Sequence, residues 1–196
     1  ASPLQAVNLI VAATKSPRAE QQAGLFTLFS NVLNALDPAS FHSPNPTDKL
    51  HYHPETPAMT VQTPTNVLVI AASNGHNLQL AERFAAAARQ QGHSAAVLDL
   101  TTINLPLFTP LAQVSGTPPR LAALEAQLAA SARWVICSPE YNGSIPPVLT
   151  SAIAWLSVQG SDFRALFNGR PVAIATHSGG AGYGVLTAMR LQLAHL

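Results

Sequence analysis

The stretch Ser138-Pro139-Glu140-Tyr141-Asn142-Gly143-Ser144-Ile145-Pro146-Pro147 follows a short apolar run, 134–137, and precedes another apolar segment, 148–156. This pattern predicts a buried strand, a tight turn that carries glycine and proline, and a helix. In open α/β sheets, ligands bind at the carboxyl ends of the strands, in turns of this kind. We therefore expect the turn to bind a ligand. The alternative is a rigid strand-to-helix turn without one.

Strand and helix patterns alternate on both sides of this turn. Short apolar runs predict strands, and alanine-rich amphipathic segments predict helices. The expected strands cover 67–71, 95–100, 134–137 and 171–176, and the expected helices cover 77–91, 120–131, 148–156 and 185–196. Regular alternation with short links predicts a parallel sheet with helices on both faces.

Four such units lack the fifth strand of a flavodoxin-like sheet, whose strand order is 2-1-3-4-5. A buried strand over 7–13 and an amphipathic helix over 19–36 stand at the other end of the chain. We therefore expect an α/β, flavodoxin-like three-layer sandwich with a five-stranded parallel sheet, circularly permuted so that the fifth strand and helix come first. The alternative is an amino-terminal extension on a chain that stops before the fifth strand.

The expected organisation is a single domain. Residues 1–36 form the permuted strand and helix, 37–65 a linker, and 66–196 the core from the first strand to the fourth helix. The linker holds six of the 16 prolines and three of the seven histidines, without apolar periodicity. The pair His51 and His53 in this linker has no identifiable third ligand, so no metal site is expected.

Composition limits the classes of partner. The chain has 196 residues, a net charge of +1 and no run of lysine or arginine, which argues against nucleic acid or an anionic membrane. Only 10% of the residues are charged, against about 25% in typical domains, so we expect a homodimer or homotetramer. The single Cys137 excludes an internal disulfide and fits a reducing compartment. Apolar runs too short for a bilayer and the lack of a signal-peptide pattern complete the expectation of a cytoplasmic protein.

Two further turns are expected at the same edge of the sheet. The first, Ser73-Asn74-Gly75-His76-Asn77-Leu78, places short polar residues at a helix amino terminus, which suits an anion; a simple helix cap at Ser73 or Asn74 is the alternative. The second, 176–184, carries four glycines within 179–184 and predicts a loop that closely approaches something, or else a flexible loop. We expect the three turns to surround one ligand.

These motifs make residues 66–196 similar to the flavodoxin-like NADPH-dependent FMN reductase family. The similarity rests on Ser-Asn-Gly-x-Asn-Leu at 73–78, on the proline-flanked motif at 139–147 and on His-Ser-Gly-Gly at 177–180. Where many relatives carry an arginine in the first loop, this chain has His76. The resemblance implies that Ser73, His76, Asn77 and Leu78 hold the FMN phosphate, that Pro139, Glu140, Tyr141, Asn142, Gly143 and Ser144 clasp the isoalloxazine, and that His177, Ser178 and Gly179 border the ring.

The resemblance also implies an activity. NADPH or NADH would reduce bound FMN, which would pass electrons in a ping-pong cycle to a small-molecule acceptor: a quinone, an azo compound, a metal oxyanion or free flavin. The protein supplies orientation and electrostatics, so no catalytic acid or base is named. The alternatives are an FMN-binding electron carrier, against which the net charge of +1 argues, and a flavodoxin-like module without catalysis.

Overall fold

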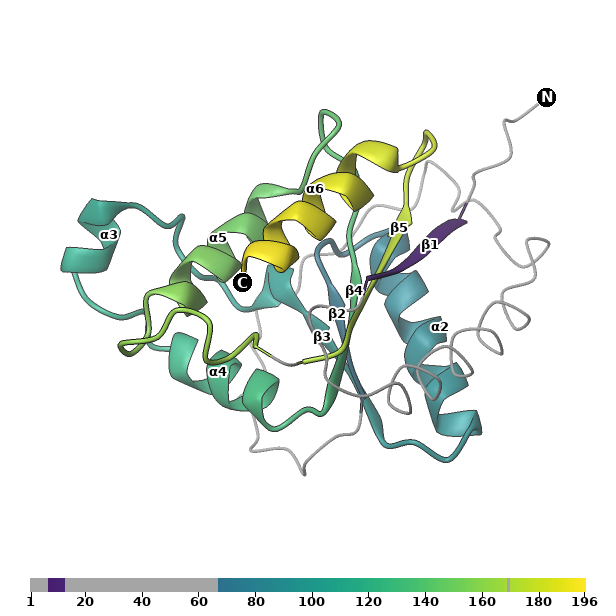
Figure 1. Cartoon of the computed structure of the whole chain (residues 1–196), viewed down its shortest axis with the longest axis horizontal. Coiled ribbons are helices and arrows are strands. Elements are labelled where there is room, and N and C mark those ends of the chain that lie inside the picture. The colour runs from purple at the N-terminus through teal and green to yellow at the C-terminus, as the bar shows by residue number, and fades with distance from the viewer. Residues whose placement is uncertain (1–6, 13–66, 169) are drawn as a thin grey trace.

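A mixed sheet forms the middle layer of the protein (Figure 1). The computed structural model describes residues 7–12, 67–168 and 170–196, and the fold is given for these residues. The strand order is β1-β5-β4-β2-β3. The strands are β1 (Val7–Ala12), β2 (Val67–Ala71), β3 (Ala95–Asp99), β4 (Arg133–Cys137) and β5 (Val172–His177).

Four of these strands confirm the sequence-based prediction. β2 pairs in parallel with both β3 and β4, and β4 pairs in parallel with β5. Ile70 in β2 lies opposite Leu98 in β3 and Ile136 in β4. The order of these four strands is the one expected for a flavodoxin-like sheet.

The edge strand β1 corrects the prediction of five parallel strands. β1 lies beside β5, where a permuted fifth strand belongs, but the two run antiparallel, with Val7 opposite His177 and Ala12 opposite Val172. An antiparallel edge strand on an otherwise parallel sheet is common, and an apolar run carries no information about strand direction. The pairing therefore does not supply the parallel strand that a permutation requires. The helix expected over 19–36 and the linker over 37–65 lie outside the described residues.

Helices cover both faces of the sheet (Figure 1). α2 (His76–Gln90) covers one face, and α4 (Leu121–Ala129), α5 (Pro147–Ser157) and α6 (Tyr183–His195) cover the other. The segment expected to be a loop between β3 and α4 also forms two short helices, η2 (Leu100–Thr102) and α3 (Pro110–Val114). Thr109 explains the start of α3, because its hydroxyl accepts the N–H of Ala112 at 3.0 Å.

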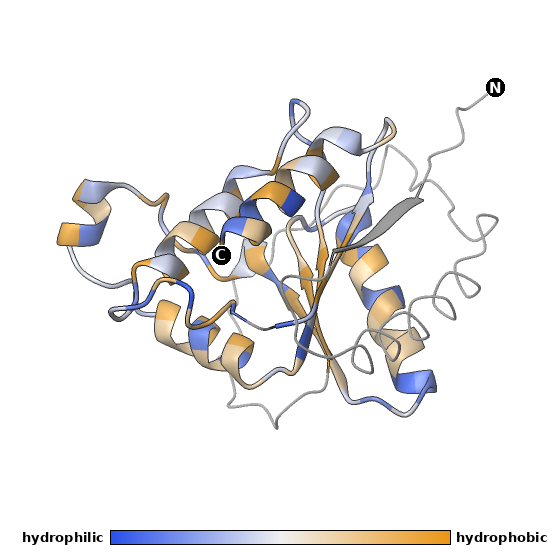
Figure 2. Cartoon of the chain, viewed as in Figure 1, coloured by the Kyte–Doolittle hydropathy of each residue, from blue (hydrophilic) through white to orange (hydrophobic). Residues whose placement is uncertain are grey.

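Alternating side chains of the strands divide the core in two. In β2, Leu68 and Ile70 pack with the cluster under α4, α5 and α6, whereas Val67 and Val69 pack against α2. The central strands are accordingly coloured as strongly apolar in Figure 2. None of the helices in the described part of the chain is long and apolar enough to cross a bilayer.

The strand order also indicates where a ligand-binding crevice is expected in a sheet of this kind. The chain leaves β2 toward β3 on one side and returns to β4 on the other, so the order reverses between β2 and β4. Ligands of open α/β sheets bind at such a reversal, outside the carboxyl ends of the strands. The loops that follow β2, β4 and β5 are the three turns singled out by the sequence.

Candidate functional site

The first loop leads into a helix whose amino terminus is not capped by a side chain. Gly75 occupies the cap position of α2, no side chain of the described residues bonds the end of this helix, and its first turn holds no acidic residue. The capping role considered for Ser73 and Asn74 is therefore not found. The first turn of an α-helix carries N–H groups without intrahelical acceptors and the positive end of the helix dipole. This end of α2 thus offers a site for an anion.

Asn77 joins the first loop to the third. Its side chain is 2% exposed. Its amide nitrogen donates to the carbonyl of His177 at 2.9 Å, and its amide oxygen accepts the N–H of His177, also at 2.9 Å. Each polar atom of the side chain therefore makes a hydrogen bond to the backbone of His177 inside the protein. Leu78, its neighbour, packs against the apolar cluster under α2.

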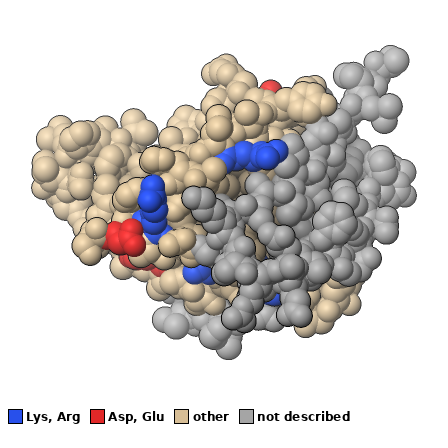
Figure 3. Space-filling view, in the orientation of Figure 1, with Lys and Arg blue, Asp and Glu red and all other residues tan. Residues whose placement is uncertain are grey.

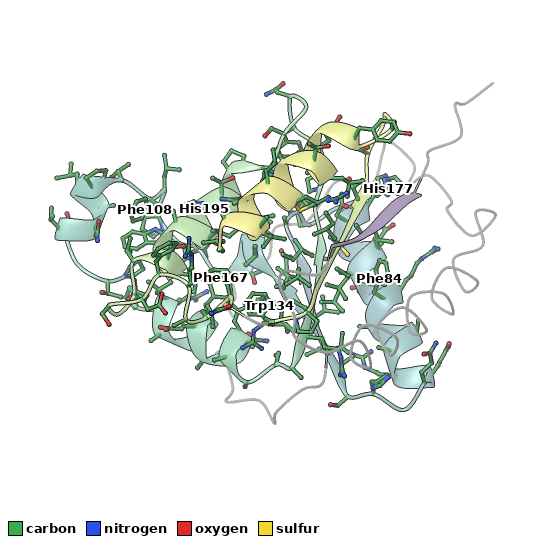
Figure 4. The ribbon with its side chains drawn as sticks, in the orientation of Figure 1. Phe84, Phe108, Trp134, Phe167, His177 and His195 are labelled. Atoms are coloured by element: carbon green, nitrogen blue, oxygen red, sulfur yellow. The ribbon has the colours of Figure 1, made fainter. Side chains whose placement is uncertain are left out.

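Two histidines meet at this edge of the sheet. The rings of His76 and His177 lie with their centroids 4.5 Å apart and tilted by 31°. The Nδ1 atom of His76 is buried and has no hydrogen-bond partner among the described residues. His177 lies at the end of β5, far from Trp134 and Phe167, which pack together at the other end of the sheet (Figure 4). A buried nitrogen without a partner marks a position where a bound group can complete the hydrogen bonding.

The surroundings of His177 oppose its charged form. Burial, the neighbouring His76 and the positive charge of Arg83 lower the pKa of His177 below its ordinary value of 6.5, although a backbone hydrogen bond partly raises it. At neutral pH the imidazole is therefore mostly neutral, a form in which one ring nitrogen donates a hydrogen bond and the other accepts one.

This lowered pKa predicts a loss of stability in acid. Below about pH 6.5 the unfolded chain binds a proton at His177 that the folded protein resists, so the free energy of unfolding falls with pH until the folded pKa is reached. The contribution of this group is at most about 1.4 kcal/mol per pH unit. We expect His177→Asn to flatten the decline of Tm between about pH 7 and pH 5, and the control His195→Asn, at the exposed end of α6, to leave it unchanged. An equal decline in all three proteins would contradict the assignment.

The second loop contains a very tight turn. Tyr141 and Ser144 exchange two backbone hydrogen bonds, at 3.1 and 3.0 Å, and Asn142 and Gly143 between them have φ of 52° and 73°. Two successive residues with positive φ form a type I′ turn, for which Asn-Gly is the preferred sequence. Tyr141, Asn142, Gly143 and Ser144 are exposed, whereas Pro139 is buried. The turn therefore stands at the rim of the crevice, on a buried base.

The second loop is attached to α6. The carboxylate of Glu140 accepts the N–H of Val185 at 3.1 Å. A methyl group added to Gly184 would lie 2.1 Å from the carbonyl oxygen of Gly143, so the backbones of the two loops touch. An acidic group at a helix amino terminus interacts favourably with the helix dipole. Glu140 thus supplies α6 with the anion that α2 lacks among the described residues.

The third loop turns sharply from β5 into α6. Ser178 is buried, and its hydroxyl donates to the carbonyl of Gly180 at 3.1 Å, while Gly179 is exposed. Gly182 has a φ of 70° and packs on Thr176, where a methyl group would lie 2.5 Å from the side chain. The hydroxyl of Thr176 is buried without a hydrogen-bond partner among the described residues. The loop therefore makes close contacts within itself and with the end of β5.

Neither a metal nor a reactive thiol is indicated at this edge. No group of three or more potential metal ligands occurs in the described part of the chain. Cys137 is completely buried at the end of β4, and burial raises the pKa of its thiol far above its ordinary value, which makes it a poor nucleophile. The described surface in Figure 3 is mostly uncharged, with scattered charges of both signs. The polar groups that the three loops bring to this edge include backbone amides, histidines and hydroxyls.

Sequence patterns alone missed the α6 side of this site. Gly184 contacts Gly143 of the second loop, and the N–H of Val185 donates to Glu140. The exposed Tyr183 precedes them in the chain. The glycines after β5 signalled a close approach, but they did not identify the partner. That partner lies 41 residues earlier, at Gly143, a separation that local patterns do not encode.

Fold and site together define a flavodoxin-like α/β protein with three loops around the crevice between β2 and β4. Residues 65–196 match the model of the NADPH-dependent FMN reductase family. The chain therefore belongs to this family, and it is an oxidoreductase that uses FMN as cofactor and NAD(P)H as electron donor. None of the curated proteins matches the chain significantly.

Solved structures with the same type of fold include FerB, a flavoenzyme NAD(P)H:acceptor oxidoreductase from Paracoccus denitrificans. Its sequence is 20% identical, the match covers 67% of this chain and 71% of that chain, and the TM-score is 0.56. An azoreductase from Bacillus anthracis is 23% identical over 47% of this chain and 55% of its own, with a TM-score of 0.37. An oxidoreductase from Corynebacterium diphtheriae is 14% identical over 68% and 93%, with a TM-score of 0.39. At such identities the likeness to FerB supports the fold.

The described residues fit FMN. The phosphate needs hydrogen-bond donors and positive potential, which the uncapped first turn of α2 offers beside the unpartnered Nδ1 of His76. The isoalloxazine needs a narrow space with polar edges, and the type I′ turn over 141–144 presents exposed backbone there. No acidic residue of the described chain caps α2 and would repel the phosphate.

Proposed function

We propose that this protein transfers electrons from NAD(P)H, through FMN held by the three loops, to a small organic or inorganic acceptor in a ping-pong cycle. The acceptor classes are quinones, azo compounds, metal oxyanions and free flavin. The observation that carries the proposal is the uncapped amino terminus of α2 at the same strand-order reversal as the exposed turn 141–144. When bound, FMN supplies the hydride and electron chemistry.

The residues of the chain divide the binding between them in this proposal. The first turn of α2, with Ser73 and His76, holds the phosphate, and the neutral His177 borders the ring together with Ser178 and Gly179. The turn from Tyr141 to Ser144 lies along the polar edge of the ring. Tyr183, 68% exposed next to the contact between Gly184 and Gly143, adds an aromatic side chain to the same rim. Such a rim suits flat aromatic acceptors.

We also propose that the protein is a homodimer or homotetramer in the cytoplasm and that residues 1–36, 37–65 and 66–196 are parts of one domain. Exposed apolar side chains on and before α3 support self-association: Leu107, Leu111 and Val114. Sizing by light scattering tests the oligomer, and a mass of a single chain would contradict it.

The spectrum of the purified protein tests the flavin site. We expect the protein to bind FMN with the visible absorption of a bound flavin, and to bind riboflavin at least about tenfold more weakly, because riboflavin lacks the phosphate that α2 and His76 would hold. Titrations that follow flavin fluorescence measure both affinities. Equal affinities would contradict the phosphate assignment, and no binding of either flavin would contradict the cofactor site.

Turnover tests the activity separately. With bound FMN, oxidation of NADPH or NADH should depend on an added quinone or azo dye. Double-reciprocal plots of initial rate against NAD(P)H concentration, at several acceptor concentrations, should give the parallel lines of a ping-pong order. A protein that binds FMN but does not oxidise NAD(P)H would instead be an electron carrier.

A further inference from the structure

The carboxylate of Glu140 faces the protein and not the crevice. It accepts the N–H of Val185, the third residue of α6, at 3.1 Å. The cap position of α6 is Gly182, which has no side chain to offer. A carboxylate is therefore the group that satisfies this N–H, although it comes from a loop 45 residues earlier in the chain.

The same contact includes the backbone. A methyl group on Gly184 would lie 2.1 Å from the carbonyl oxygen of Gly143, 2.8 Å from its carbonyl carbon and 3.0 Å from the carboxylate of Glu140. The first turn of α6 and the turn over 141–144 therefore meet without room for a side chain. The backbone contact of Gly184 with Gly143 and the hydrogen bond from Val185 to Glu140 are therefore neighbours in the first turn of α6.

The loop is held on both sides of the exposed turn, by buried Pro139 before it and by Ile145, which packs against the core, after it. The two internal hydrogen bonds of the turn, between Tyr141 and Ser144, close it on itself and do not connect it to the sheet. The base of the loop is held at Ser138, whose N–H donates to the carbonyl of Ala175 at 3.0 Å. Between this base and the exposed turn, the hydrogen bond from the N–H of Val185 to the carboxylate of Glu140 connects the loop to α6.

We propose that Glu140 is a positioning residue: its carboxylate ties the second loop to α6 and thereby sets the place of the turn over 141–144 at the flavin site. The inference rests on the proposed function of that site. It departs from the resemblance, which counts Glu140 among the residues that clasp the ring. The carboxylate acts through the loop, and the exposed backbone of the turn contacts the flavin.

Three variants test the proposal: Glu140→Ala removes the acceptor, Glu140→Gln keeps an acceptor oxygen without the charge, and Asp162→Ala is the matched control. Asp162 also accepts a backbone N–H with its carboxylate, from Arg164 at 2.9 Å, and Arg164 in turn contacts the far end of α6 at His195. We expect E140A to bind FMN about tenfold more weakly, E140Q to recover to within about threefold of the wild type, and D162A to bind like the wild type. Wild-type affinity of E140A would overturn the proposal. An E140Q as weak as E140A would assign the effect to the charge and overturn it as well.

Amide hydrogen exchange of the flavin-free protein gives an independent readout. In E140A the amides of Val185, Tyr141 and Ser144 should exchange at least about tenfold faster, with the rest of α6 protected, and E140Q should restore much of the protection. Unchanged exchange at these amides would overturn the positioning role whether or not FMN binds. If wild-type protein does not bind FMN, the proposed function fails, and the exchange experiment still decides the role of Glu140. If E140A does not fold, Gly184→Ala perturbs the same contact from the α6 side, and the same exchange and affinity measurements apply to it.

Discussion

Gly184→Ala is expected to weaken FMN binding by about tenfold or more and to lower the free energy of unfolding by up to about 2 kcal/mol. The new methyl group would lie 2.1 Å from the carbonyl oxygen of Gly143, so the second loop or the first turn of α6 must move. Overpacking of this kind costs about 1–3 kcal/mol. The better helix propensity of alanine offsets about 1 kcal/mol of that cost, since Gly184 lies inside α6.

The FMN affinity should fall as well as the stability, because the displaced turn over 141–144 forms one side of the proposed flavin site. Fluorescence titration measures the affinity, and thermal unfolding measures a decrease in Tm of about 2–4 °C per kcal/mol for a protein of this size. Gly180→Ala is the matched control for stability: it lies in the same loop, and a methyl group there meets no atom within 4 Å. Wild-type FMN affinity in Gly184→Ala would contradict the close contact of the two loops.

The sequence predicts the four parallel strands well because each one is a short apolar run bounded by turn residues. Val67 to Ala71 is buried along its whole length, as a strand covered on both faces must be. The direction of β1 could not be predicted in the same way, because its apolar residues fit a parallel or an antiparallel edge equally well. Direction is decided by the path of the chain between the strands, and that path is set by tertiary contacts.

The α3 segment was missed for a different reason. Five residues form the helix, too few for a periodic pattern to stand out, and two prolines nearby favour a loop assignment. Thr109 followed by Pro110 is nevertheless a good helix start, with a hydroxyl cap before a proline at the first helical position. The cap was thus the available signal, and it is weak without a longer apolar stripe behind it.

In the candidate site, the sequence predicts the backbone of the turn at 142–143 better than the contacts of the loop side chains. The Asn-Gly pair at 142–143 predicts a turn with positive φ, and the structure has one. Asn77 and Glu140 are different, because their side chains bond backbone groups 100 and 45 residues away. A polar residue in a ligand loop can face the ligand or the protein, and only the tertiary structure distinguishes these two orientations.

Asn77→Leu should be strongly destabilising. It removes the donor and the acceptor that pair with the carbonyl and the N–H of His177, and the side chain is 2% exposed, so water cannot replace them without opening the core. Each buried backbone group left without a partner costs about 1–3 kcal/mol. We expect a loss of about 2–5 kcal/mol in the free energy of unfolding, measured by urea denaturation at pH 7.5.

Asn77→Asp separates the two bonds. An aspartate can still accept the N–H of His177, but it places a carboxylate oxygen against the carbonyl of His177, where the amide now donates. At neutral pH the loss of stability in Asn77→Asp should therefore be at least as large as that in Asn77→Leu. The loss should shrink in acid, because a protonated carboxyl can donate to that carbonyl. Gln79→Ala, an exposed change on the same helix, is the control and should alter stability by less than about 0.5 kcal/mol. If Asn77→Leu unfolds at the wild-type urea concentration, Asn77 does not join the first loop to β5, and its amide becomes available again as a direct ligand of the phosphate.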